Sequence, residues 1–400
     1  AAGALLREQF SYRVVSWRAG FVCGLTAVAI GFTNPIAMSL TEILLGVMAF
    51  CWLLAGGYRR KIQAITCNPV ALSALALLAV LSISVLYGNA PWNETLRALA
   101  KYRNLLYLVL FITIFRTARM REAGLWAFAV AMTLTLIFSF LTAAGVPLWE
   151  SRYTLKADDA VVFRNHIVHG LCMGLFAYLM AHRFAEQPRR RWYFGVLALL
   201  AIWNVLFMVA GRTGYLVLAA MIPLFCVQHF RLRTMACVTA VLVAVGIVGY
   251  FHSSIFTERV GLAYTDVATY LDYRLGNGPL QPEGSRYPVT RTSCGIRLDW
   301  YRNGLRLMAR KPILGVGVGS VRHEMQFLTE KNGKRSAPPA NNLHSEYIMT
   351  AAQTGMIGLL AMGILLVNYW RTGRQLSSRM RHLAEGTLLT LIVAGLANTI

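Results

Sequence analysis

Residues 336–358 read SAPPANNLHSEYIMTAAQTGMIG, a polar, proline-broken segment that becomes an apolar run at Leu343. His344 stands in the first turn of that run. Similar apolar runs recur along the chain, each of a length that can cross a bilayer as a helix. Short loops separate them, apart from one long basic insertion at residues 253–342. The pattern predicts an all-α polytopic membrane protein with one large loop.

The composition of the 400 residues supports this fold class. The chain is 56% hydrophobic and only 14% charged, with a mean hydropathy of +0.52, whereas a soluble domain carries about 25% charged residues. A net charge of +22 would suggest nucleic acid in a soluble protein. Here much of the positive charge lies in short loops between apolar runs, so we expect membrane lipids and no nucleic acid as partners. The seven cysteines contain no CxxC pair, which indicates neither a disulfide scaffold nor a zinc site.

Eleven spans are expected, and a twelfth is expected beyond residue 400. They lie near residues 17–33, 36–56, 69–87, 103–116, 123–145, 166–182, 192–210, 213–229, 234–252, 343–369 and 384–400. This divides the chain into helices 1–9 with short loops (residues 1–252), a large loop (253–342) and helices 10–11 (343–400). The fourth span is short, and Lys101 and Arg103 beside it are expected to snorkel.

The orientation follows from the basic loops, which face the cytoplasm under the positive-inside rule. These loops hold Arg59–Lys61, Arg116–Arg121, Arg183–Arg191, Arg231–Arg233 and Arg371–Arg381. The insertion and the segment 146–169 are then outside. Within the insertion we expect a helix around Tyr264–Arg274, an irregular loop at 276–295, and an amphipathic helix at 297–311. That last helix would lie on the membrane surface through Trp300, Leu305 and Met308.

Two arginines are candidate phosphate ligands on the outer side. Arg212 stands between Gly211 and Gly214, where glycines let backbone N–H groups approach an anion. Guanidinium binds phosphate oxygens bidentately and stays charged. Arg212 could equally be an arginine that snorkels at a helical turn. Arg297 opens the amphipathic helix, and either points into a cleft or binds lipid headgroups with its neighbours.

His344 is the candidate base. The positive end of a helix disfavours imidazolium, which lowers the pKa of the ring and keeps it neutral near pH 7. Nearby Glu346 would counter this shift. The alternative is a structural histidine at a helix cap, and Gly355 and Gly358 are interpreted as sites of close helix packing.

Other polar residues on the outer side are secondary candidates for substrate binding: Arg164, His166, Arg302, Lys101 and Arg103. Asp158-Asp159 is the only acidic pair, and no Asp-x-Asp or Asp-x-Glu is found on that side. This argues against a divalent metal, so no metal and no cofactor are expected. The run at Gly315–Gly319 lacks the spacing of a dinucleotide fingerprint.

Three elements together resemble the bacterial O-antigen ligases of the WaaL type, which share a superfamily with the Wzy O-antigen polymerases. His344-Ser345, nine residues, Gly355, two residues and Gly358 are similar to the ligase signature. Arg212-Thr-Gly-Tyr-Leu216 is similar to an Arg-x3-Leu element. The stretch from Arg297-Leu-Asp-Trp300 to Lys311-Pro-Ile-Leu-Gly-Val-Gly317 resembles a third element of the superfamily. The resemblance also covers the order of spans and the large outer loop.

The resemblance implies a GT-C-like fold and a glycosyltransferase of the bacterial inner membrane with a periplasmic active face. Such enzymes move O-antigen polysaccharide from undecaprenyl pyrophosphate to lipid A–core oligosaccharide without metal or ATP. The essential arginines and histidine of the family correspond to Arg212, Arg297 and His344. In this reading the arginines stabilise the pyrophosphate leaving group, and His344 removes the acceptor proton, with inversion at the anomeric carbon.

Three alternatives remain open at the sequence level. A polymerase of the same superfamily, or a protein O-oligosaccharyltransferase, would share the fold and the leaving group, although the histidine signature favours a ligase over a polymerase. A transporter of an anionic lipid would place charged residues near mid-membrane. Here the candidates gather at one surface, with Glu42 as the main exception.

Overall fold

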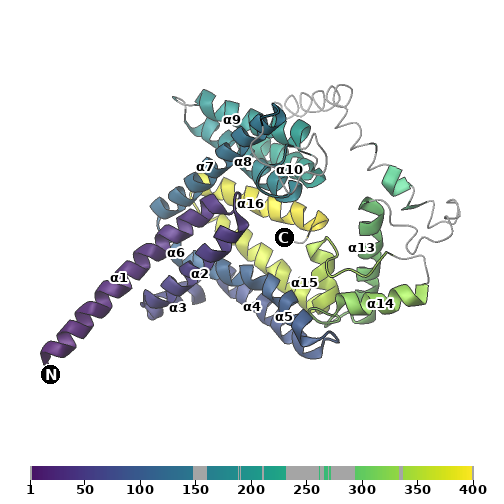
Figure 1. Ribbon diagram of the computed structural model, residues 1–400, viewed down its shortest axis with the longest axis horizontal. Coiled ribbons are helices and arrows are strands. Elements are labelled where there is room, and N and C mark those ends of the chain that lie inside the picture. The colour runs from purple at the N-terminus through teal and green to yellow at the C-terminus, as the bar shows by residue number, and fades with distance from the viewer. Residues whose placement is uncertain are drawn as a thin grey trace. The chain divides into compact units, whose positions relative to one another are not determined.

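The computed structural model describes residues 2–146, 160–187, 189, 191–209, 211–230, 261, 265–268, 270–271, 293–332 and 337–398. Their regular structure is helical, and no strand occurs among them (Figure 1). Seven helices of this described part are long and apolar enough to cross a membrane, and an eighth span results if α2 and α3 form one broken span. The predicted all-α polytopic membrane fold is therefore confirmed.

The helices follow one another with short connections over most of the described chain. Those before residue 147 are α1 (Ala2–Thr33), α2 (Met38–Leu54), α3 (Tyr58–Thr66), α4 (Pro69–Ser84), η1 (Val85–Tyr87), α5 (Trp92–Ala100), η2 (Lys101–Arg103), α6 (Asn104–Ile114) and α7 (Ala118–Ala143). Those after it are α8 (His166–Glu186), α9 (Arg191–Trp203), the π-helical turn η3 (Asn204–Met208), α10 (Arg212–His229), α13 (Ser293–Arg310), α14 (Val321–Asn332), α15 (Glu346–Gly373) and α16 (Ser378–Ala397).

Eight of the predicted spans correspond to these candidate spans, counting the bent pair of α2 and α3 as one. The predicted span 103–116 is shorter than expected, because α6 has only 11 residues. At 1.5 Å per residue it covers about 16 Å, against about 30 Å for the hydrocarbon core. The predicted span 213–229 forms a shorter apolar helix within α10. The predicted span 234–252, Asp158-Asp159 and residues 276–292 of the predicted loop lie outside the described residues. Residues 293–295, predicted as the end of that loop, belong instead to α13.

The chain divides into two compact units. Unit 1 comprises residues 1–74 and 104–215, and unit 2 comprises residues 75–103 and 216–400. In unit 1, α1 packs against α2 and α7. Small residues permit this close approach, since a Cβ at Gly31 would come within 2.9 Å of the Gly124 carbonyl oxygen. Cys23, Ala27 and Met48 are buried at the contact of α1 with α2.

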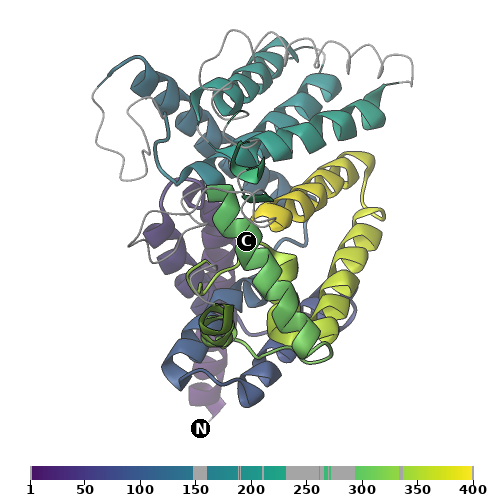
Figure 2. The ribbon, with the colours of Figure 1, turned by 90° about the vertical axis from the view of Figure 1, so that its right-hand side faces the viewer.

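In unit 2, α13 packs against α14 and α15, and α15 turns back into α16 (Figure 2). A buried apolar cluster joins α13, α14 and the start of α15, and includes Leu307, Met325, Leu343 and Met349. A helix at 297–310 is confirmed as part of α13, but α13 begins at Ser293, so Arg297 lies in its second turn and does not open the helix as predicted. The short helix α14, at residues 321–332, was not expected from the sequence.

The face that α13 packs against protein is separate from most of the stripe that was predicted to lie on the membrane. Leu305 is 52% exposed, whereas the residues spaced by four that turn inward are Asp299, Asn303 and Leu307, each 0% exposed. Two of these three residues are polar, so the distribution of apolar residues alone does not identify the side of the helix that is buried. This face packs against α14 and α15, and Trp300 of the predicted stripe packs against the same cluster, whereas Leu305 stays exposed. The orientation on the membrane surface is therefore not supported at Trp300 and stays a prediction at Leu305 and Met308.

Helix α15 is broken at Gly355, where φ is 61° and ψ is −149°. This backbone conformation is essentially restricted to glycine. Beyond the break, the N–H of Met356 donates to the Pro312 carbonyl at 2.8 Å, and that of Ile357 donates to Ile313 at 3.3 Å. Gly355 is therefore a break in the helix backbone, beside which the neighbouring loop forms hydrogen bonds with α15. It is not a site of helix packing as predicted. At Gly358 a Cβ would collide with the Thr354 side chain of the same helix, so this glycine leaves room for Thr354, and no contact with another helix supports the predicted packing role.

The loop at residues 312–320 is held on both sides. Val316 and Gly317 donate their N–H groups to the carbonyls of Ala352 and Gln353 in α15, at 2.8 and 2.9 Å. On the other side, Val318 donates to the Ser84 hydroxyl at 3.1 Å. The glycines at 315, 317 and 319 have positive φ, which explains the glycine-rich sequence. This loop fixes the end of α4 against the start of α15.

Candidate functional site

His344 precedes α15 instead of lying in its first turn as predicted, since the N-cap is Ser345 and the helix starts at Glu346. Its φ is 53°, and it is the only non-glycine residue with positive φ in the described part of the chain. The His344 N–H donates to the Asn342 side-chain oxygen at 2.8 Å, and its carbonyl accepts from the Tyr301 hydroxyl at 2.9 Å. Such strained backbone conformations cluster at functional sites.

The imidazole of His344 is held by groups from two other helices. The Trp300 ring of α13 stacks on it, with ring centroids 5.4 Å apart and an interplanar angle of 11°. Trp300 is itself fixed, because its indole N–H donates to the Pro338 carbonyl at 2.9 Å. Asn398, which follows α16, forms a side-chain hydrogen bond with His344. The ring orientation is therefore set by contacts from α13 and from the end of α16.

The electrostatic surroundings favour the neutral imidazole. Burial lowers the pKa of His344, the Arg297 guanidinium lowers it further, and the hydrogen bond with Asn398 opposes both. The direction of the predicted shift is confirmed, but its causes are burial and Arg297, and the helix end and Glu346 are not among them. A neutral ring is the form that accepts a proton.

Arg297 and His344 are neighbours because α13 is fixed against the segment before α15. A Cβ at Gly304 would come within 2.7 Å of Leu343 and 2.6 Å of Ile348, so the two elements are in close contact there. The buried Asp299 carboxylate accepts a hydrogen bond from the Ala337 N–H. Arg297 is half-buried in this arrangement.

A polar cavity of about 210 Å³ lies beside this segment, within unit 2. Its lining residues come from α5, η2, the start of α14 and the start of α15: Glu94, Arg97, Ala98, Lys101, Gly319, Val321, Arg322, Asn341, Met349 and Gln353. Three of these are cations and one is an acid. The acid, Glu94, is 3.0 Å from the His323 imidazole. The remaining positive charge suits an anionic ligand.

The predicted binding residue Lys101 therefore lines a cavity. Next to it, the Tyr102 hydroxyl donates to the Gln353 side-chain oxygen at 2.5 Å. Burial raises the pKa of Tyr102, so the hydroxyl remains protonated and the bond to α15 persists across the physiological pH range. Arg103 is not among the lining residues; it donates to the Ala100 carbonyl at 3.1 Å. Arg302 is half-buried on α13, and it also does not line this cavity.

The predicted residues of unit 1 form a second group. A Cβ at Gly211 would come within 2.7 Å of the His166 carbonyl oxygen, and one at Gly214 within 3.1 Å of Gly170. The start of α10 therefore contacts the start of α8, which brings the backbone of Arg212 near the Arg164–His166 segment. The side chain of Arg212 lies outside the described part. The helix cap at this place is Asn165, whose side chain accepts from the Val168 N–H at 3.0 Å.

His169, three residues after His166 on α8, is buried and takes part in a structural hydrogen-bond network. It is 3% exposed, and its Nε2 is 2.9 Å from the Asn204 side-chain oxygen. Asn204 donates to Ser139 at 2.7 Å, and Ser139 donates to the Ala160 carbonyl at 2.6 Å. This buried chain of hydrogen bonds fixes η3, the π-helical turn that precedes α10.

Sequence reasoning missed several residues around His344 and the cavity. Asn342 and Asn398 carry no signal in the sequence, because they act on His344 through hydrogen bonds that residue type alone does not predict. Arg97 could have been found, since it stands four residues before Lys101 in a helical segment and shares its face. Arg322 could not, because α14 was not expected.

Comparison with known families adds one finding. A model of the family described as O-antigen ligase matches residues 197–363. This range contains Arg212, Arg297 and His344, the residues on which the predicted resemblance rests. No curated protein matches the chain. The match confirms the resemblance to the superfamily of O-antigen ligases and polymerases, and it supports a membrane glycosyl-transfer function in O-antigen biosynthesis.

Proposed function

We propose that this chain, as a member of the O-antigen ligase and polymerase superfamily, is the ligase that transfers O-antigen polysaccharide from undecaprenyl pyrophosphate to lipid A–core oligosaccharide. The acceptor hydroxyl oxygen forms a bond to the anomeric carbon, and the bond from that carbon to the pyrophosphate oxygen breaks. The electron pair leaves with undecaprenyl pyrophosphate, and the hydroxyl proton passes to a ring nitrogen of His344. Direct displacement of this kind inverts the anomeric carbon.

The observation that carries this proposal is the state of His344. Its backbone is strained, its ring is stacked on Trp300, and its pKa is lowered by burial and by Arg297. A residue that only caps a helix requires none of these features. A neutral imidazole next to a guanidinium supports a base beside a bound anion, because Arg297 both lowers the pKa of His344 and attracts the pyrophosphate.

The arginines are proposed to stabilise the leaving group. Charge develops on the pyrophosphate as the glycosidic bond breaks, and guanidinium groups in a partly buried site stabilise it more strongly than in water. Arg297 and Arg212 take this role, as the family correspondence implies. No acidic pair with the spacing of a metal-dependent sugar transferase occurs on the predicted outer side, which supports a reaction that needs no metal.

The polar cavity is proposed to bind a further anionic part of a substrate, on the predicted periplasmic side of the inner membrane. Because Lys101, Arg97 and Arg322 are cations, the proposed ligands are phosphate groups of the donor or of the core oligosaccharide. Arg302, Arg103, Arg164 and His166 remain secondary candidates for contacts with sugar or phosphate.

The test is transfer in vitro with purified protein, undecaprenyl-pyrophosphate-linked glycan, lipid A–core and a chelator. His344→Ala should lower transfer at least about 100-fold, the usual contribution of a general base, while donor binding survives. His382→Ala is the matched control, because this histidine lies near the start of α16, at the opposite end of that helix from Asn398. The His382→Ala variant should transfer the polysaccharide at the rate of the wild type.

Each other outcome changes the proposal. Normal transfer by His344→Ala refutes the base assignment, and loss of transfer in chelator refutes metal independence. Elongation of the undecaprenyl-linked glycan without transfer to lipid A–core indicates a polymerase. Transfer only to a protein acceptor indicates a protein O-oligosaccharyltransferase. Movement of the lipid-linked glycan across a bilayer, with no new product, indicates a transporter.

A further inference from the structure

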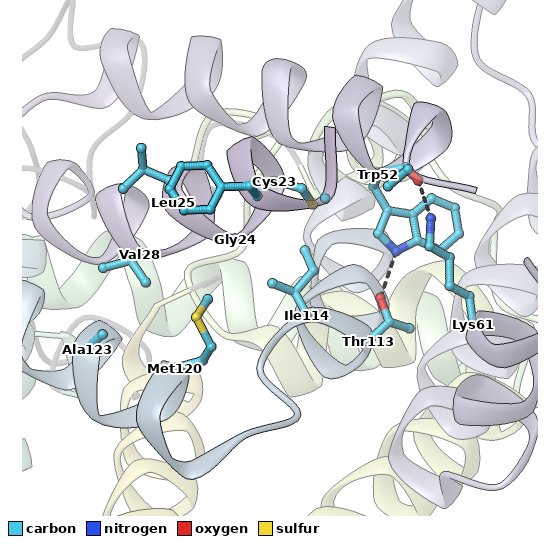
Figure 3. Close-up of a pocket in the computed structure, with 13 residues that line it drawn as sticks. Cys23, Gly24, Leu25, Val28, Trp52, Lys61, Thr113, Ile114, Met120 and Ala123 are labelled. Carbon is cyan, nitrogen blue, oxygen red and sulfur yellow. Dashed lines mark hydrogen bonds between the residues drawn. The ribbon is translucent and has the colours of Figure 1, made fainter. Parts of the chain in front are cut away.

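Unit 1 contains a cavity of about 530 Å³ that the proposed reaction does not use (Figure 3). It lies among α1, α2, α3, α6 and α7, and most of its lining is apolar, including Leu25, Val28, Ile114 and Met120. Its volume falls in the range of small-molecule and cofactor sites. A lining of this composition fits a hydrocarbon chain.

One end of the cavity is polar and is built around Lys61 of α3. The Lys61 ammonium donates to the Trp52 carbonyl and lies over the Trp52 ring, 4.3 Å from its centroid. The Trp52 indole N–H in turn donates to the Thr113 hydroxyl at 2.7 Å, as Figure 3 shows. The Lys61 side chain is therefore fixed at the cavity end and not extended into solvent.

Lys61 keeps an uncompensated charge. No carboxylate forms an ion pair with it in the part of the chain that the structure describes. An ammonium has three N–H bonds, and the Trp52 carbonyl takes one of them. A partly buried cation at the end of an apolar cavity suits a ligand with an anionic head and a hydrocarbon tail.

The helix ends around the cavity indicate which leaflet such a ligand would come from. The cavity is lined by the ends of α2 and α6 and by the starts of α3 and α7, so it lies at one end of unit 1. That end carries five further basic residues: Arg59, Arg60, Arg116, Arg119 and Arg121. The positive-inside rule assigns it to the cytoplasmic side, where the leaflet is anionic. Trp52 and Tyr58 there are residue types enriched at headgroup level.

We propose that this cavity binds one anionic phospholipid of the cytoplasmic leaflet, with an acyl chain among α1, α6 and α7 and the phosphate on Lys61. Basic pockets between transmembrane helices on the cytoplasmic side bind anionic headgroups in this way. None of the residues that line this cavity is assigned to transfer, so the two proposals stand or fall separately.

The experiment measures bound lipid by native mass spectrometry after titration with phosphatidylglycerol or phosphatidylethanolamine. Wild type should retain one tightly bound phosphatidylglycerol and prefer it to phosphatidylethanolamine. Lys61→Gln should reduce that preference about fivefold, the effect of one basic residue at an anionic surface. The matched control is Arg60→Gln, which removes the same charge from the adjacent, exposed position of α3 and should leave the preference unchanged.

A second variant tests the apolar part independently of charge. Ala123 lines the cavity, so Ala123→Leu should lower the occupancy of both lipids. Three results would overturn the proposal. They are an unchanged preference in Lys61→Gln, an equal loss in Arg60→Gln, and displacement of phosphatidylglycerol by undecaprenyl phosphate in a Lys61-dependent manner. The last result would make the cavity a polyprenyl-lipid site.

Discussion

Replacing Gly355 by alanine is expected to separate the glycine-rich loop from α15 and to lower transfer. Gly355 has φ 61° and ψ −149°, a conformation that residues with a Cβ rarely adopt. The added Cβ would lie 2.5 Å from the carbonyl carbon and oxygen of Ile313, which are backbone atoms that cannot rotate away. Either the break closes into regular helix or the 312–313 segment moves.

The cost follows from the contacts that are lost. A non-glycine residue in this backbone region costs about 1–3 kcal/mol. The hydrogen bonds of Met356 and Ile357 to the loop carbonyls weaken with it, and each contributes about 1 kcal/mol. The total is about 3–5 kcal/mol, which for a chain of 400 residues corresponds to a melting temperature lower by about 4–6 °C.

The measurement is the melting temperature in detergent together with the rate of transfer. Gly363→Ala provides the control, because it lies in the same helix with open space around its Cβ position. Alanine there should be neutral or slightly stabilising, since it favours helix over glycine. A Gly355→Ala protein that melts and transfers like wild type would refute the claim that this backbone break supports the site.

Three further predictions concern the site itself. Because the pKa of His344 is lowered and a base must be unprotonated, the acid limb of kcat/KM for transfer should lie below pH ~6.5; an acid limb above it would contradict the direction of the shift. Trp300→Leu should lower the rate of transfer about 2–10-fold, because it releases the imidazole of His344. Trp300→Phe should lower the rate less, because a phenyl ring can still stack on the imidazole, and steady-state kinetics would distinguish the two variants. Arg322→Gln should raise KM for one substrate about fivefold, whereas Arg310→Gln, outside the cavity, should not; equal effects would indicate general surface attraction.

The span pattern was predictable because hydropathy over about 20 residues reports the bilayer directly. The prediction failed where an apolar run in the sequence was longer than the helix that it forms. Residues 103–116 are apolar enough for a span, yet they follow α5 and η2 and form only the 11-residue α6. The amphipathic pattern of α13 predicts a helix correctly but does not identify the face that packs against protein, since Asp299 and Asn303 turn inward to hydrogen-bond partners from the 337 segment and from α13 itself.

The site was predictable to the extent that it consists of charged or titratable residues. His344 and Arg297 were identified from their positions near a helix start, and the structure makes them neighbours through α13. The groups that hold them were not predictable, because Tyr301, Asn342 and Asn398 act through hydrogen bonds, and Tyr301 and Asn398 lie far from His344 in the sequence. The positive φ of His344 could not be predicted either, because the residue type histidine does not by itself require that backbone conformation.

The fixed spacing from His344 to Gly355 has a structural explanation. The residues between them form a helical segment, Glu346–Thr354, whose nine residues cover about 13 Å. His344, the proposed base, precedes this segment, and at its end is the break that hydrogen-bonds to the 312–317 loop. Gln353, just before the break, binds Tyr102 and lines the polar cavity beside Lys101. An insertion or deletion of one residue would rotate the base by about 100° relative to the loop and the cavity. The spacing therefore keeps the proposed base and the cationic residues that line the polar cavity of unit 2 in one register.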